Sequence, residues 1–215
     1  MRLSKEEGTY LVKLARRAVE EYLVNLVRIP PPADAPKALR EKRGVFVTIE
    51  TIVERPGGEW GRELRGCIGY PEPVKPLVEA VIDSAIAAAT EDPRFPPMRA
   101  EELKDVIFEV SVLTPLQEVK YQDPSELPEK IVVGKHGIVI ERGFLKGLLL
   151  PQVAIEYGWS SKEFLSQACV KAGLPPDAWL YGGVKVYVFE AQIFAELAPN
   201  GEVIERILLP GGWDE

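Results

Sequence analysis

Residues 44–69, GVFVTIETIVERPGGEWGRELRGCIG, decide the fold. Over residues 44–54, Val and Ile alternate with Phe, Thr and Glu, a pattern typical of a strand with one buried face. Pro-Gly-Gly at 56–58 is a turn signal. Residues 60–64 are expected to return as a partner strand that runs directly into Arg-Gly-Cys-Ile-Gly at 65–69. The stretch therefore predicts an antiparallel hairpin with a glycine-bracketed cysteine at its end.

A helix is expected on each side of this hairpin. Ser4 and Glu7 have the spacing of a capping box, and apolar residues recur every three or four positions as far as Leu26. Three prolines at 30–32 end this helix. A second apolar helix is predicted over residues 74–90.

The rest of the chain predicts more strands than helices. Strands are expected at 106–113 and 184–197, a hairpin at 131–141 that turns at Gly134–Gly137, and helices at 151–157 and from Ser160 to Gly173. Because the strands come in hairpin-like groups, the predicted class is α+β, a mainly antiparallel sheet packed with helices. We expect one domain over residues 1–215, with the turn-rich middle as a second lobe.

Composition excludes several functional classes. The 215-residue chain has 26 Lys and Arg against 33 Asp and Glu, and its net charge of −7 argues against a general nucleic-acid or membrane surface. It has no apolar stretch long enough to span a bilayer and no targeting segment, so we expect a cytoplasmic protein. Scarce Asn, Met and Cys beside abundant charge suggest a thermophilic source.

Cys67 is the first candidate for chemistry. Two glycines, Gly66 and Gly69, lie close to it, so that backbone and thiol could both approach a ligand. Arg65 could favour its thiolate or hold an anion. The alternative is a small buried hydrophobe in a tight passage from strand to turn, which is what most free cysteines are.

His136 is the only histidine of the chain. It could serve Cys67 as a general base, because Cys169 falls on a predicted apolar helix face. The alternative is an exposed turn residue. One histidine and one accessible cysteine are too few for a standard zinc site, and no phosphate-binding or dinucleotide-binding glycine pattern is present, so we expect no metal and no cofactor.

Asp92 and Arg94 lie in a stiff, proline-rich connector at residues 92–97. Their charges could pair with each other. Alternatively, Arg94 and Arg65 could together form an anion pocket.

Several segments together resemble the AMMECR family, named after a human chromosomal region. The resemblance lies in Leu-Arg-Gly-Cys-Ile-Gly at 64–69, Asp-Pro-Arg-Phe at 92–95, Gly-Lys-His-Gly-Ile at 134–138 and Leu-Pro-Gln-Val-Ala at 150–154. Trp159 and Lys-Ala-Gly at 171–173 extend it. The match covers most of the chain in the right order.

This resemblance implies an α+β fold with two unequal lobes and a cleft between them, in a cytoplasmic protein. It implies no particular reaction. It also implies a link to Memo-like and radical-SAM proteins. The residues that it places together at one site are Arg65, Gly66, Cys67, Gly69, Asp92, Arg94, His136 and Gln152.

Two hypotheses follow. In the first, the protein is an enzyme acting on an anionic or acyl substrate, with Cys67 as nucleophile, His136 as base, and Arg65 and Arg94 as anion stabilisers. In the second, the 65–69 segment is structural and the protein is a non-catalytic module that binds a protein or RNA through an apolar or basic patch.

Overall fold

The computed structural model describes residues 2–209 and 212–213 of the chain. The chain divides into two compact units. The first contains the residues up to Leu113 together with Gln192–Arg206, and the second contains Thr114–Ala191 together with the residues from Ile207. Helices and antiparallel strands occur in both units, so the predicted α+β class is confirmed.

The first unit is built on a five-stranded sheet with the order β2-β1-β3-β8-β9. Strand β1 pairs antiparallel with both β2 and β3, and β8 pairs antiparallel with β9. The elements are α1 (Lys5–Asn25), β1 (Val45–Glu54), β2 (Trp60–Tyr70), α2 (Leu77–Thr90), β3 (Val106–Leu113), β8 (Ala191–Glu196) and β9 (Val203–Arg206), with short 3-10 helices at Lys37–Arg40 and Ala100–Lys104.

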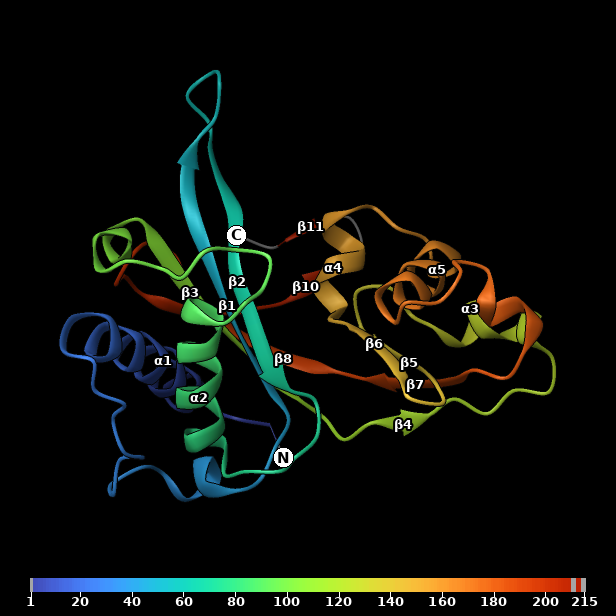
Figure 1. Ribbon diagram of the computed structural model, residues 1–215, viewed down its shortest axis with the longest axis horizontal. Coiled ribbons are helices and arrows are strands. Elements are labelled where there is room, and N and C mark those ends of the chain that lie inside the picture. The colour runs from blue at the N-terminus through green and yellow to red at the C-terminus, as the bar shows by residue number, and fades with distance from the viewer. Residues whose placement is uncertain (1, 210–211, 214–215) are drawn as a thin grey trace. The chain divides into compact units, whose positions relative to one another are not determined.

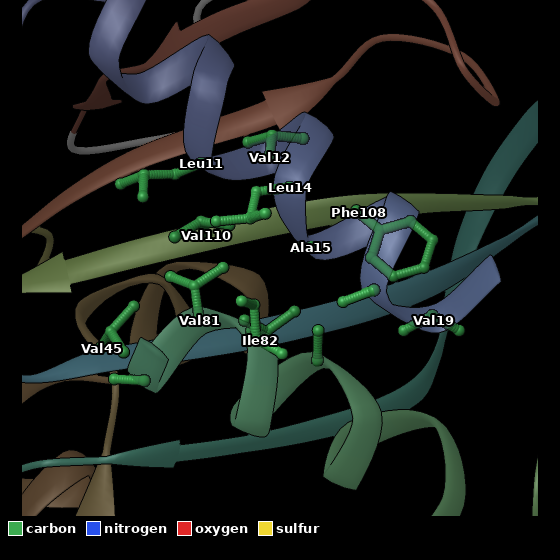
Figure 2. Packing of buried hydrophobic residues seen from close by; sticks show 14 of the residues in the cluster. Leu11, Val12, Leu14, Ala15, Val19, Val45, Val81, Ile82, Phe108 and Val110 are labelled. Carbon is green, nitrogen blue, oxygen red and sulfur yellow. The ribbon is translucent and has the colours of Figure 1, made fainter. Parts of the chain in front are cut away.

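Helices α1 and α2 cover one face of this sheet. The predicted capping box is present, because Ser4 and Glu7 each bind the other's backbone N–H. Apolar side chains from both helices meet those of β1 and β3 in one cluster, shown in Figure 2. In the first half of β1 every second residue belongs to that cluster, namely Val45, Val47 and Ile49. The alternating pattern of the sequence therefore marks the helix-covered face.

The β1–β2 hairpin extends past the rest of its sheet. Strand β3 pairs with β1 only from Val45 to Thr51, whereas β2 follows β1 to Glu54. Residues 52–62 therefore form a two-stranded ribbon, which projects beyond the other strands in Figure 1.

The second unit has a four-stranded sheet with the order β4-β7-β5-β6 and its own apolar core. Helix α5 packs closely on β6, because Gly147 leaves room for the backbone of Ala172. The elements are β4 (Gln117–Glu118), α3 (Leu127–Lys130), β5 (Gly137–Arg142), β6 (Leu145–Leu149), α4 (Pro151–Glu156), α5 (Ser161–Lys171), β7 (Lys185–Phe189), β10 (Leu208–Leu209) and β11 (Gly212–Trp213), with 3-10 helices at Pro124–Glu126 and Ala178–Tyr181.

Two sequence predictions about strands are wrong. The single strand expected over residues 184–197 is broken at Glu190 into β7 and β8, which belong to different sheets. Residues 131–133 form no strand, and the hairpin of this region is instead made by β5 and β6. Its turn lies at Gly143, whose φ of 61° is in the left-handed region that favours glycine.

Candidate functional site

A β-bulge in β2 sets the direction of the side chains around Cys67. Near the turn, Glu54 lies opposite Trp60. If this register continued along the whole hairpin, Thr48 would lie opposite Gly66. The register shifts next to Glu50, so that Thr48 lies opposite Cys67 instead. A one-residue shift moves every following side chain to the other face of a sheet. The bulge therefore turns the Cys67 side chain away from the helix-covered core.

The two glycines of the 64–69 segment are needed for packing. A Cβ atom at Gly66 would overlap the backbone carbonyl of Ala88 in helix α2. At Gly69 it would overlap the backbone of Val45 and the ring of Phe46. Both glycines lie in strand β2, where they allow protein groups to approach. A ligand at Gly66 and Gly69 stays a prediction.

Cys67 is a half-buried residue, and its thiol lies beside a hydroxyl group. Thr48 Oγ1 donates to Cys67 Sγ at 3.3 Å. Burial raises the pKa of the thiol to about 11, and the Thr48 hydrogen bond and the Arg94 charge offset this only in part. At neutral pH the thiol is therefore protonated, whereas a nucleophilic cysteine needs a lowered pKa.

Asp92 holds the connector 92–97 against the edge of β2. Its carboxylate accepts the Cys67 backbone N–H at 2.9 Å. It also accepts the backbone N–H of Arg94, at 3.1 Å, and the Arg94 guanidinium, at 2.9 and 2.7 Å. Burial works to raise the pKa of Asp92, but the hydrogen bonds from Arg94 and Cys67 lower it to about 2. The pairing of Asp92 with Arg94 is confirmed.

Arg65, the extra residue of the bulge, is bound by protein groups. Its guanidinium donates to both carboxylate oxygens of Glu102, at 2.8 and 3.2 Å, and to the carbonyl of Pro96 at 3.0 Å. The Phe95 ring lies 5.9 Å from the Arg65 guanidinium and 5.5 Å from that of Arg94. Each guanidinium thus already has a carboxylate partner, and an anion pocket between them stays a prediction.

His136 lies in the second unit, in the turn before β5. Its Nδ1 accepts the Val132 backbone N–H at 3.2 Å, and its own backbone N–H donates to the Val132 carbonyl at 2.9 Å. Burial and the charge of Lys135 lower the pKa of the ring. The ring also lines a hollow of about 160 Å³, together with Thr114, Gln117, Val188, Phe189 and Glu190.

The residues predicted to form one site are divided between the two units. The first unit brings together Arg65, Gly66, Cys67, Gly69, Asp92 and Arg94. The second holds His136 and the buried Gln152 of α4. The pairing of Cys67 with His136 and the cleft between two lobes therefore stay predictions.

Sequence analysis missed the partners of these residues. Thr48 and Glu102 are ordinary strand and helix residues, and only the register of the bulged hairpin and the course of the connector place them here. It also missed Glu50, which shares the Cys67 face of the sheet with Glu109 and Arg206. Burial and the charge of Glu109 raise the pKa of Glu50.

Neither a metal cluster nor a membrane span is found in the described part of the chain. Within residues 2–209 and 212–213, no three His, Cys, Asp or Glu side chains are grouped so as to hold a metal ion. Over the same residues, no helix combines the length and the apolar character needed to cross a bilayer.

The chain is thus an α+β protein in which the Asp-Pro-Arg-Phe connector holds a bulged edge strand. The AMMECR1 family model matches residues 12–194 and so runs through both units. The chain belongs to the AMMECR1 family.

Similar proteins come from thermophilic archaea. A protein of Thermofilum pendens is 64% identical over 208 residues, which cover 96% of this chain and 98% of the relative. A protein of Methanocaldococcus jannaschii is 51% identical over 207 residues, covering 96% and 98%. The crystal structure of an uncharacterized protein from Pyrococcus horikoshii matches with a TM-score of 0.90 and 50% identity, covering 97% of this chain and all of that one.

Proposed function

We propose that this protein is a non-catalytic binding module for another protein, in the cytoplasm, and that the 64–69 segment is structural. The observation that carries the proposal is the set of contacts around Cys67: Asp92 accepts its backbone N–H and Thr48 Oγ1 donates to its sulfur. Burial raises the pKa of the thiol to about 11, which leaves little thiolate at neutral pH. An enzyme acting through this cysteine on an acyl or anionic substrate would need the opposite shift.

The other candidate catalytic groups support the same proposal. Arg65 is held by Glu102 and Arg94 by Asp92, so neither guanidinium is a free anion receptor. His136 Nδ1 is engaged by the backbone of its own turn. Groups that stabilise the charge of a transition state are expected to point at the substrate position. These groups instead form hydrogen bonds with other groups of the protein.

A protein partner fits better than RNA. The net charge of −7 requires a concentrated basic face for RNA, and the projecting ribbon of residues 52–62 is not one, because it has two carboxylates and two guanidiniums. The link to Memo-like and radical-SAM proteins that the resemblance implies is compatible with this proposal. Two free cysteines agree with a reducing compartment such as the cytoplasm.

The rate of thiol alkylation against pH tests the proposal. We expect iodoacetamide to label Cys67 slowly at pH 7, with a rate that rises with pH towards about 11. Mass spectrometry assigns the adduct, which should disappear in Cys67→Ser. The buried Cys169 serves as the internal control for unfolding. A labelling rate that levels off at or below the ordinary thiol value of about 8.5 would overturn the proposal.

A further inference from the structure

We propose that the edge of β2 at Trp60–Leu64 binds an extended segment of a partner protein as an added strand, and that this segment alternates apolar with basic residues. The inference rests on the proposed function and names the chemistry of the partner. It is carried by three features of residues 52–64: an edge that is open in one half only, two exposed apolar side chains on one face, and carboxylates without ion pairs.

Only half of the β2 edge is closed. Strand β2 is the end strand of its sheet, so its outer backbone groups have no neighbouring strand. At the Cys67 end, Asp92 takes the outward N–H and the Arg65 bulge interrupts the ladder. Proteins close edges in this way against unwanted pairing. Nothing among the described residues closes the Trp60–Leu64 half, and strand addition is a known mode of peptide binding.

One face of the open half carries two exposed apolar side chains. By register, Trp60, Arg62 and Leu64 lie on the same face, and Ile52 is the neighbour of Arg62 on β1. Trp60 is 72% exposed and Leu64 41% exposed, although both are large apolar side chains. A tryptophan beside an arginine and aliphatic groups is the composition that dominates binding energy at protein interfaces. Apolar side chains of an added strand would cover this face.

Three carboxylates supply the charge that selects the partner. Glu63 lies on the other face of β2, Glu54 lies opposite Trp60 on the Trp60 face, and Glu59 lies in the turn. None of these three carboxylates forms an ion pair in the described part of the chain. Of the two arginines of the ribbon, Arg62 lies 3.9 Å from Glu50, and the Arg55 side chain lies over Gly61, so the three carboxylates outnumber the cations near them. Lys or Arg side chains alternating with apolar ones would therefore complement the strand.

Peptide binding to the full chain tests the inference. The probe is acetyl-Val-Lys-Val-Lys-Val-Lys-amide, and the control peptide has Glu in place of each Lys. Backbone amide NMR should show saturable shifts confined to residues 52–64 with the basic peptide, and binding at least ten-fold weaker with the acidic one. Glu63→Lys should reduce this preference, and Trp60→Ala should weaken binding about ten-fold. Phe144→Ala, at the exposed turn of the β5–β6 hairpin, is the matched control and should leave binding unchanged.

Several results would overturn the inference. These are equal binding of the two peptides, shifts outside residues 52–64, or no saturable binding at millimolar peptide. If the amide shifts of the ribbon change with protein concentration alone, the edge binds a second copy of this chain. If they change on addition of oligouridine, the edge binds RNA. The alkylation measurement separates the two proposals. If the thiol is inert and the peptide fails, only the strand addition is wrong.

Discussion

The two halves of strand β2 differ in whether their backbone and side-chain groups have partners within the protein. At residues 65–69 the backbone N–H of Cys67, both arginines nearby and both glycines are used within the protein. At residues 60–64 the strand has an open edge and an exposed tryptophan. The sequence of residues 65–69 predicts a functional site, yet their groups bind and pack within the fold. Residues 60–64 have no such sequence motif, and their edge and side chains are available to a partner.

The largest change in stability is expected when a methyl group is added in the 65–69 half, and the same change in the 60–64 half is its control. Gly66→Ala should lower the free energy of unfolding by about 3 kcal/mol, because the new Cβ overlaps the Ala88 carbonyl and helix α2 must move. Gly61→Ala is the control in the same strand. There the new Cβ meets only the flexible end of Arg55, and we expect a change within about 0.5 kcal/mol. Denaturant titration measures both. Equal losses would mean that the two halves pack alike.

The Asp92 lock should appear as a pH dependence of stability. Its pKa is about 2 in the folded protein and near 3.9 in an unfolded chain, so its contribution is complete above pH 4 and is lost as the pH falls towards 2. The wild-type protein should lose about 2 kcal/mol over this range that Asp92→Asn does not lose. At pH 7 the variant should be less stable than wild type by a similar amount. Parallel pH profiles of the two proteins would contradict the lock.

The smallest effect is expected in the open half. Trp60→Ala should change the free energy of unfolding by no more than about 0.5 kcal/mol, because the side chain is mostly exposed. Trp179, buried in the second unit, provides the comparison, and Trp179→Ala should cost about 3–5 kcal/mol. Thermal denaturation followed by circular dichroism ranks the two variants. A large loss for Trp60→Ala would show that the ribbon is part of the folded core.

The hairpin, the capped helices and the α+β class could be predicted from local pattern. Alternation in β1 and the capping box at Ser4 need only neighbouring residues. The environment of Cys67 could not be predicted, because it depends on the bulge at Arg65. Without the bulge, the thiol would point into the core. A single extra residue in a ladder has no reliable signal in one sequence.

The break at Glu190 was also invisible to periodicity. Alternation continues from Val186 to Ile193, so the pattern favours one strand where the chain forms two. What divides it is tertiary: Glu190 exchanges two hydrogen bonds with Thr114, its N–H donating to Thr114 Oγ1 and its carbonyl accepting the Thr114 N–H, each at 2.9 Å. Such long-range partners cannot be read from spacing along the chain.

Strands β3 and β8 are neighbours in the first sheet although the whole run Thr114–Ala191 separates them in the chain. During synthesis the ribosome therefore delivers β3 long before the strand that completes its pairing. Until β8 has been synthesised, one edge of β3 has unpaired backbone N–H and C=O groups, and such an edge is prone to aggregation. Folding of the inserted unit brings the two ends of that run together, as the Thr114–Glu190 bonds indicate, and so shortens the search by which β8 finds its place.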